Sequence, residues 1–248
     1  MATNAGGTTA PWAGWTYTGA AFDPATLAAS MWSRDYVAPT PWVSLASAGI
    51  SGSCPPWNSF NSGVDPVASA IGTSGYDAAD FDGSTCYTDC QVTEATLFTP
   101  TAGGILCLFN ADVAAADTGN KNDNPTIFGG NAGTSPRLTF SSSGVAGVVY
   151  SGGYIERMVA CATSGWHLVM MRWDGVNLGM TLDSAAEVTV ASGTVYLTGA
   201  LELAGINGVW SAFYDGKIAE IMTFRTTPTP TEYANFKAYC NTRYGLSL

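Results

Sequence analysis

The feature that most limits the possible folds is a period-two alternation of apolar and polar residues that recurs from about Ala79 onward. Short apolar runs are separated by Gly, Asn, Asp and Ser, as expected for strands joined by tight turns. Eleven runs predict strands: residues 86–92, 104–110, 126–129, 137–141, 145–150, 155–161, 166–173, 178–183, 187–191, 195–203 and 216–224. Eleven strands suffice for two packed sheets, so the pattern predicts an all-β fold, an antiparallel β-sandwich.

The dipeptide Asp174-Gly175 gives the strongest local signal for a hairpin. It stands between the predicted strands 166–173 and 178–183. A tight primed turn needs positive φ, which glycine adopts at little cost. We therefore expect these two strands to pair directly, with their register fixed at the turn.

The strand that precedes this turn carries apolar residues on both of its faces. Trp166, Leu168 and Met170 alternate with Val169 and Met171. Alternate residues point to opposite faces of a sheet, so a strand of this kind is covered on both sides. The pattern places it in the middle of a sheet.

The C-terminal region is the one segment whose pattern is typical of a regular helix. Thr229, Pro230 and Glu232 form a capping box in which the Thr229 hydroxyl and the Glu232 carboxylate each accept from the other residue's amide. Gly245 is placed to end the helix in a left-handed conformation. An apolar stripe recurs every four residues: Phe236, Cys240 and Tyr244. We expect this helix to cover one edge or face of the sandwich.

The first sixty residues differ from the rest, because they hold five of the eight tryptophans without a sustained period: Trp12, Trp15, Trp32, Trp42 and Trp57. We interpret residues 1–60 as an extended, aromatic-rich N-terminal arm and residues 61–248 as the sandwich domain. A short helix is predicted where Asp23 can cap a first turn that begins at Pro24, with Leu27 and Met31 on one side.

Charge excludes one large class of partner. The chain has 9 Lys and Arg against 19 Asp and Glu, a net charge of −10, and no cluster of basic residues. Binding to nucleic acid depends on such clusters, so no nucleic-acid partner is expected. Its apolar runs are far shorter than the roughly twenty residues that cross a bilayer, and no membrane partner is expected either. The N-terminus lacks the features of a secretory signal, which predicts synthesis in the cytosol.

Three segments together resemble the laminin-G-like or concanavalin-A-like jelly-roll domains. They are residues 80–84 (DFDGS), residues 165–175, and residues 215–221 (DGKIAEI) followed by the terminal helix. The likeness spans about Phe81 to Leu248, and residues 22–32 look like the lead-in of some bacterial and phage members. The resemblance implies a jelly-roll β-sandwich. That fold hosts lectins, glycanases, adhesion modules and virion proteins, so it does not select a function.

No cluster of reactive groups points to catalysis. A retaining glycanase needs two carboxylates about 5 Å apart on one face, and the nearest match, Asp215 with Glu220, has an odd spacing that places them on opposite faces. Glu156, Glu187 and Glu202 are isolated. The single histidine, His167, is expected to be hydrogen-bonded near a sheet edge. We therefore expect no enzyme, no catalytic residue and no cofactor.

Metal and disulfide sites are also not predicted. The loop 110–124 is rich in hard oxygen donors suited to calcium, but no pattern in it fixes a coordination set. A polar, solvated loop is the preferred interpretation, and the expected metal content is none. Cytosolic synthesis argues against a need for disulfides, although Cys86 and Cys90 are the pair to check. Cys107 and Cys240 are expected to be buried.

Trp12, Trp15 and Tyr17 are the candidate interaction residues, because their spacing lets them share one face of an extended arm. Such rings could stack on pyranose sugars. Aromatic residues also dominate interface cores, and we favour anchoring of the arm on this subunit or a neighbour.

Together with the resemblance, these features lead to the hypothesis of a non-enzymatic structural protein of a phage virion, a capsid decoration or head-surface protein that stabilises the shell. Its expected partners are neighbouring virion subunits, either the major capsid protein or copies of itself in a homo-oligomer. Its expected location is the virion, assembled in the host cytoplasm. The alternative is a carbohydrate- or receptor-binding module of a phage tail or surface adhesin, with host glycans as partners.

Overall fold

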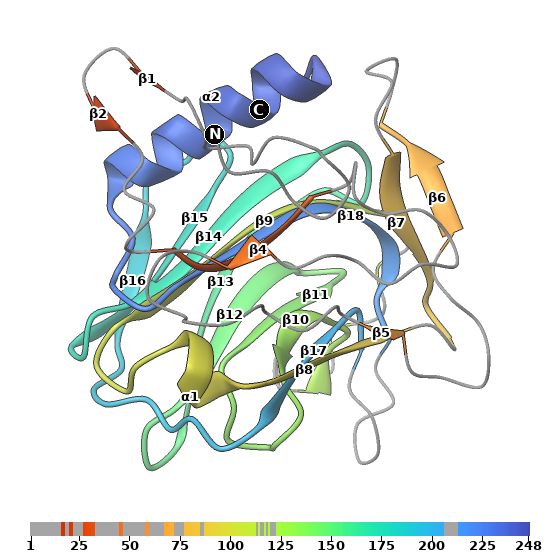
Figure 1. Cartoon of the computed structure of the whole chain (residues 1–248). Coiled ribbons are helices and arrows are strands. Elements are labelled where there is room, and N and C mark those ends of the chain that lie inside the picture. The colour runs from red at the N-terminus through yellow and green to blue at the C-terminus, as the bar shows by residue number, and fades with distance from the viewer. Residues whose placement is uncertain are drawn as a thin grey trace.

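The computed structural model describes residues 87–112, 123–205 and 213–248 continuously, together with shorter pieces. These pieces are residues 16–17, 20–21, 27–32, 45–46, 58–59, 67–71 and 77–84 and the single positions 114, 117 and 119. The described strands form two large antiparallel sheets that pack face to face, with one long helix across the outside of one sheet (Figure 1). Within these residues, no helix is both long and apolar enough to span a bilayer.

One sheet contains seven described strands and is called here the seven-stranded sheet. Its order is β13 (Tyr154–Val159), β12 (Gly144–Tyr150), β11 (Arg137–Ser141), β10 (Thr126–Gly130), β17 (Ala200–Leu203), β8 (Thr88–Thr93) and β5 (Asn58–Ser59). The strands β10 to β13 follow the chain as successive antiparallel neighbours. By contrast, β17 and β8 come from distant parts of the sequence and pair with each other beside them.

The second sheet has nine described strands and is called the nine-stranded sheet. Its main order is β16 (Val188–Ala191), β15 (Asn177–Leu182), β14 (His167–Trp173), β9 (Gly103–Ala111), β18 (Asp215–Phe224), β3 (Leu27–Trp32) and β4 (Leu45–Ala46). The first half of β18 pairs instead with β7 (Asp77–Asp82), which in turn pairs with β6 (Val67–Ala70). A separate small ribbon joins β1 (Thr16–Tyr17) to β2 (Ala20–Ala21).

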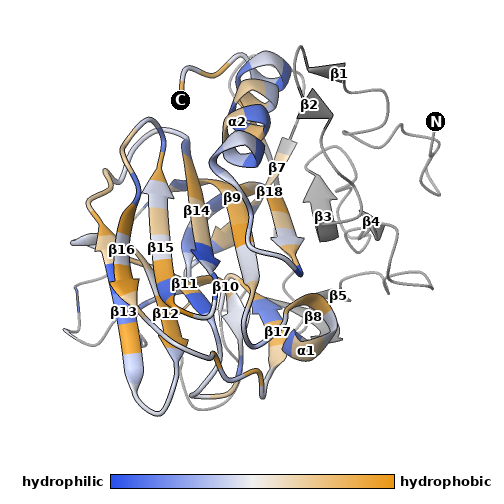
Figure 2. Cartoon of the chain, turned by 90° about the vertical axis from the view of Figure 1, so that its left-hand side faces the viewer, coloured by the Kyte–Doolittle hydropathy of each residue, from blue (hydrophilic) through white to orange (hydrophobic). Residues whose placement is uncertain are grey.

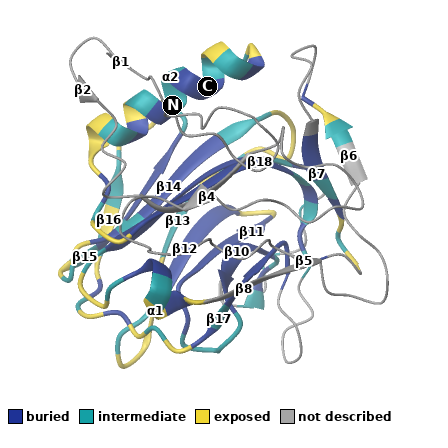
Figure 3. Cartoon of the chain, in the orientation of Figure 1, coloured by how far each residue is buried: buried dark blue, intermediate teal, exposed yellow. Residues whose placement is uncertain are grey.

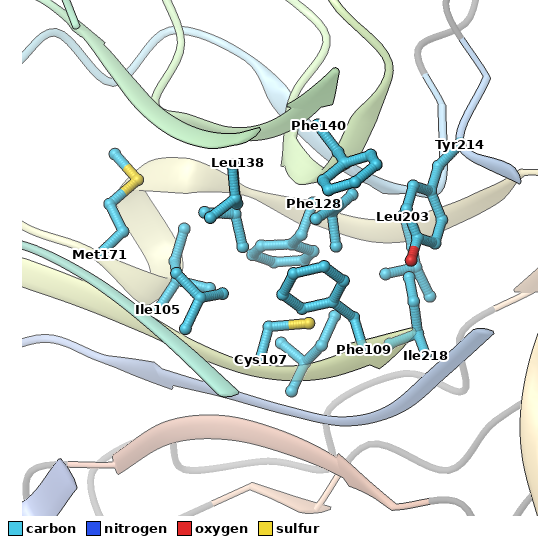
Figure 4. Close-up of a cluster of buried hydrophobic side chains, with 14 of the residues drawn as sticks. Ile105, Cys107, Phe109, Phe128, Leu138, Phe140, Met171, Leu203, Tyr214 and Ile218 are labelled. Atoms are coloured by element: carbon cyan, nitrogen blue, oxygen red, sulfur yellow. The ribbon is translucent and has the colours of Figure 1, made fainter. Parts of the chain in front are cut away.

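The main core lies between the two sheets (Figure 4). Ile105, Cys107 and Phe109 of β9 meet Phe128 of β10 and Phe140 of β11, and all five are essentially inaccessible to solvent. Cys107 is buried as a small apolar residue, as expected. Burial of this apolar surface is the dominant favourable contribution to folding.

A second core lies between the nine-stranded sheet and α2 (Pro230–Tyr244), which crosses its outer face (Figure 2). Leu168 and Met170 of β14 face this helix, while Val169 and Met171 face the other core. The prediction of a strand covered on both sides is therefore confirmed.

The helix itself has the predicted ends. Both hydrogen bonds of the capping box are present: Glu232 N donates to Thr229 Oγ1 at 3.2 Å, and Thr229 N donates to Glu232 Oε2 at 2.7 Å. Gly245 ends the helix at a φ of 65°. The predicted stripe is buried against the sheet: Phe236, Cys240 and Tyr244.

The predicted hairpin is also present. Gly175, at a φ of 81°, and Val176 form its two-residue loop, because Asp174 N donates to Asn177 O at 3.2 Å. The Asp174 carboxylate accepts from the amides of Val176 and Asn177 at 2.9 and 2.7 Å. Pairing of β14 with β15 then runs from Trp173 opposite Leu178.

Two predicted elements are wrong. Leu27–Trp32 is a strand of the nine-stranded sheet, not a helix, and pairs antiparallel with the second half of β18. A spacing of four between Leu27 and Met31 also places them on one face of a strand, so the pattern fits both structures. The predicted strand 195–203 is shorter: only Ala200–Leu203 forms β17, and residues 192–199 form a loop.

Candidate functional site

One end of the sandwich gathers several connections that carry exposed aromatic and polar side chains. They are the β12–β13 hairpin, the short helix α1 (Glu94–Leu97) with residues 98–102, the loop 192–199 between β16 and β17, and the end of β18. Figure 1 shows α1 beside the cyan trace of this loop, and Glu94 N donates to Gly199 O at 3.1 Å. We call this region the loop end.

Three tyrosines form a cluster at the loop end, called here the tyrosine patch: Tyr150, Tyr154 and Tyr196. The Tyr150 ring lies 5.3 Å from the ring of Tyr154 and 5.3 Å from that of Tyr196, measured between centroids. Tyr154 is 46% exposed and Tyr196 is 47% exposed, and with Val176 they are the exposed large hydrophobic residues of the described chain. The half-buried Tyr150 thus supports two rings that face solvent.

The loop that carries Tyr196 is held by hydrogen bonds to three different segments. Val195 N donates to Pro100 O at 2.8 Å, and Tyr196 N donates to Tyr150 O at 2.9 Å. The amides of Thr198 and Gly199 donate to one carboxylate oxygen of Glu94, at 2.7 and 3.0 Å. These bonds replace a strand ladder, which explains why the period-two pattern of residues 195–199 did not form a strand.

Glu94 is the buried support of this loop. Its side chain has no solvent exposure, and burial raises the pKa of its carboxyl group above the usual value, while the amides of Gly199 and Thr198 act in the opposite direction. The guanidinium of Arg137, also buried, further favours the charged form. Because the anchoring group is rigid and buried, the loop presents Tyr196 in a fixed place, which lowers the entropic cost of binding a ligand.

A cleft of about 480 Å³ opens beside the tyrosine patch. It is lined by Ala95, Phe98, Thr99 and Pro100, by the loop residues 194–198, and by Arg225. Most of its surface is apolar, and the lining residues with polar side chains are three threonines, Tyr196 and Arg225. A cleft of this size with a few polar groups matches the usual character of small-ligand sites.

The walls of the cleft are fixed by the core behind them. The Phe98 ring packs edge-on against the buried Trp173 ring, with centroids 5.0 Å apart. Trp173 Nε1 donates to Thr99 O at 3.0 Å, and Thr227 Oγ1 donates to Trp173 O at 2.7 Å. The cleft is therefore a preformed feature of the sandwich.

The sequence-predicted carboxylates do not form a catalytic pair. Glu220 is buried under α2, where it accepts hydrogen bonds from Tyr239 and Tyr244, whereas Asp215 opens β18 next to Gly83. Glu187 is paired with Arg172, and Glu202 accepts from Asn131 at 3.2 Å. These acids contact other protein groups, and none of them lines the cleft.

His167 is hydrogen-bonded to a carboxylate as expected, but it does not lie at a sheet edge, because it begins the interior strand β14. Its Nδ1 lies 2.8 Å from Asp183 Oδ2, and this hydrogen bond, followed by the nearby Cys161 thiol, raises the pKa of His167 to about 10. At neutral pH the ring is therefore an imidazolium, which cannot accept a proton from a hydroxyl nucleophile. Asp183 Oδ1 also accepts from Leu168 N at 2.8 Å, so the pair ties the ends of β14 and β15 together.

The loop 110–124, whose oxygen donors would suit calcium, uses some of them in contacts within the protein, as its described residues show. Asp117 Oδ1 accepts from Gly119 N at 2.9 Å, and Asp112 lies 2.5 Å from Lys217 Nζ. Asn122 lies outside the described residues. Across the described part of the chain, no three His, Cys, Asp or Glu side chains gather as a metal site would require.

The predicted interaction residues of the arm are not tested by this geometry. Trp12 and Trp15 lie outside the described residues, and Tyr17 is described only as backbone of β1. Cys86, one of the two cysteines of the possible disulfide, also lies outside the described residues. Cys107, Cys161 and Cys240 are free thiols.

Sequence reasoning missed the tyrosine patch, Glu94 and Arg225. One signal was available: Tyr150 and Tyr154 flank a Ser-Gly-Gly turn, where an aromatic residue has few neighbours to cover it. The contribution of Tyr196 from a third segment could not be read from spacing.

Comparison with known proteins establishes the fold. The chain matches no protein-family model and no curated protein. Domain 4 of AbnA, a GH43 extracellular arabinanase from Geobacillus stearothermophilus solved with arabinotriose, is 13% identical with a TM-score of 0.64, over 86% of this chain and 98% of that domain. The CBM40 of the Ruminococcus gnavus IT-sialidase, bound to α2,3-sialyllactose, is 12% identical with a TM-score of 0.50, over 69% and 97%.

A third similar structure is the binding domain of Paraclostridial Mosquitocidal Protein 1. It is 10% identical with a TM-score of 0.60, and the match covers 88% of this chain and 53% of that one. At these identities the likeness shows the fold alone. The expected architecture is confirmed: the chain is a jelly-roll β-sandwich with a C-terminal helix.

Proposed function

We propose that this chain is a non-catalytic carbohydrate-binding module and that the loop end is its binding surface. The observation that carries the proposal is the tyrosine patch: two half-exposed rings, braced by a third, beside a preformed cleft. Exposed aromatic groups at a cleft mark interaction sites, because leaving them in water costs free energy that a ligand recovers.

Sugars suit this surface for a chemical reason. One face of a pyranose ring presents C–H groups that pack on an aromatic ring, while its hydroxyls need hydrogen-bond partners. Tyrosine supplies a rigid apolar ring and a polar hydroxyl at low cost in side-chain entropy. The exposed threonines 194 and 198 add hydroxyls at the same cleft. Two of the similar structures were solved with an oligosaccharide bound, which also supports a carbohydrate ligand for this chain.

The test is binding of the purified chain to a glycan array, followed by calorimetry with the best ligands. Tyr154→Ala and Tyr196→Ala should each weaken binding at least tenfold, whereas Tyr154→Phe and Tyr196→Phe, which keep the ring, should retain most of it. The surface control is Lys237→Ala, on the helix α2 that covers the outer face of the nine-stranded sheet, since Lys237 does not line the cleft. Equal binding by the alanine variants and wild type would contradict the proposal, and so would the absence of any glycan ligand.

The narrower hypothesis of a virion subunit stays a prediction. It rests on the resemblance of the sequence, on its low charge and on the arm, and most of residues 1–60 lie outside the described part of the chain. Mass spectrometry of purified particles tests the location. Deletion of residues 1–18 tests the arm, because the truncated protein should lose its place on the particle.

A further inference from the structure

We infer that the sugar bound at the loop end carries a carboxylate group and that Arg225 is the residue that recognises it. This inference rests on the proposed carbohydrate-binding function and specifies the class of ligand. Its basis is the position of one cation in an otherwise acidic protein.

Arg225 is the one charged side chain that lines the cleft within the described residues. It is exposed, and no carboxylate of the described chain lies within 4.0 Å of it. Two other cations of the described chain are paired with carboxylates: Arg172 pairs with Glu187, and Lys217 lies 2.5 Å from Asp112 and 3.5 Å from Asp80. What distinguishes Arg225 is its position: it brings to the cleft a positive charge that has no carboxylate partner among the described residues, in a chain of net charge −10.

The guanidinium is also held in place. Arg225 directly follows Phe224, the buried last residue of β18, so its backbone is fixed by the sheet. Its Nη1 donates to the carbonyl of Thr96 in α1, with a longer contact of 3.5 Å to the carbonyl of Ala95. These bonds orient one corner of the group through neutral acceptors and leave its positive charge uncompensated.

An oriented guanidinium favours a carboxylate over a hydroxyl. Arginine has five N–H donors in a planar fork, and Nε and Nη2 have no acceptor among the described residues. A carboxylate can accept two such bonds in parallel, and charge-assisted hydrogen bonds of this kind are about twice as strong as neutral ones. A neutral sugar would gain no comparable advantage from a cation at this position.

The remaining charges limit the ligand to one or few carboxylates. Glu94 of α1 does not line the cleft: it is buried, and its Oε2 accepts from the amides of Thr198 and Gly199. The net charge of −10 repels a long polyanion, and one arginine provides little compensation. A sugar with a single acidic group, stacked on Tyr196 and paired with Arg225, fits both constraints.

Calorimetry with matched pairs of oligosaccharides tests this inference. The probes are 3′-sialyllactose against lactose, and digalacturonate against galactobiose. Wild type should bind at least one acidic member ten to a hundred times more tightly than its neutral counterpart. This preference should fall as salt is raised.

Two controls separate charge from folding. The methyl ester of the preferred acidic sugar keeps its shape without its charge, and wild type should bind it as weakly as the neutral sugar. Arg225→Gln should lose the preference and bind the acidic sugar and its neutral counterpart equally, and Arg225→Lys should keep part of the preference.

Two contrary results have different meanings. Equal affinity for acidic, esterified and neutral sugars would overturn the role of Arg225 but leave the carbohydrate-binding function intact. Failure to bind any acidic or neutral sugar of these pairs or of the array would overturn both.

Discussion

The molecule has two clusters of tyrosines that differ in what covers them. Under α2, Tyr239 and Tyr244 are buried, both donate to Glu220, and the Arg243 guanidinium lies 5.5 and 5.4 Å from their ring centroids. At the loop end, Tyr154 and Tyr196 keep about half of their surface in water. In Figure 3 the sheet under α2 is dark blue, whereas yellow segments gather at the connections.

The contrast shows how one residue type serves two purposes. Where the protein supplies both an apolar cover and an acceptor for the hydroxyl, tyrosine fixes a helix to a sheet. Where the protein supplies only a brace for the ring, the exposed face remains available to a ligand. We therefore expect substitutions at the first cluster to change stability and substitutions at the second to change binding.

The largest effect on stability is expected for Glu220→Ala. The change removes the acceptor of two tyrosine hydroxyls and the carboxylate that lies 3.8 Å from Arg243 Nε, all in a buried place. Breaking a buried network of this kind costs roughly 3–5 kcal/mol of unfolding free energy. Urea denaturation measures it. Glu220→Gln, which retains an oxygen acceptor, should lose less, and a loss under about 1 kcal/mol in the alanine variant would contradict the role of the cluster.

Glu94→Ala should lower both the stability of the fold and the affinity for glycan, because Glu94 lies under the loop end. The substitution leaves the amides of Thr198 and Gly199 without their acceptor, which costs roughly 1–3 kcal/mol for the buried amide of Gly199 and less for the part-buried amide of Thr198. The freed loop should also bind glycan more weakly. Glu94→Gln keeps an acceptor oxygen and is the matched control. Unchanged affinity in a stably folded alanine variant would show that the loop needs no such anchor.

A pH dependence follows from His167, whose pKa rises from its usual 6.5 to about 10 on folding. The stabilisation is complete below about pH 6.5 and is lost as pH rises through 10, because the folded state then loses the proton that it binds more tightly. The His167–Asp183 pair is partly exposed, and solvent screening reduces its contribution below that of the full pKa shift. We therefore expect the wild type to lose about 1–2 kcal/mol more than Asp183→Asn between pH 6 and pH 10. Parallel urea curves at both pH values give this difference, and identical losses would exclude the ion pair as its source.

The smallest effect on stability is expected for Tyr196→Ala. Nearly half of the side chain is already exposed, and the loop is held by backbone bonds that the substitution keeps. The unfolding free energy should change by less than about 1 kcal/mol, although glycan binding weakens. A loss comparable to that of Glu220→Ala would show that the patch is part of the core.

Much of the fold was predictable because its signals are local. The alternation in β14, the capping box at Thr229 and the turn at Gly175 each depend on residues that are close in sequence. The strand β3 could not be predicted in this way, because the spacing of four between Leu27 and Met31 suits both a helix and a strand. Its pairing with β18, almost two hundred residues later, decided between them.

The candidate site could not be predicted for the same reason. Tyr150, Tyr196, Glu94 and Arg225 come from four separate segments, and only the closing of the sandwich brings them together. A buried glutamate and an exposed arginine have no local pattern that distinguishes them from ordinary surface residues. The sequence did indicate aromatic residues as a sugar platform, but it directed attention to Trp12, Trp15 and Tyr17 of the arm.

The most direct test of a glycan-binding loop end is an NMR titration of the isotopically labelled full chain with its best array ligand. The account predicts amide shift changes concentrated in residues 94–100, 150–154 and 194–198 and at Arg225, with little change along α2. Shift changes confined to the arm or to the α2 face, with the loop end unaffected, would contradict it.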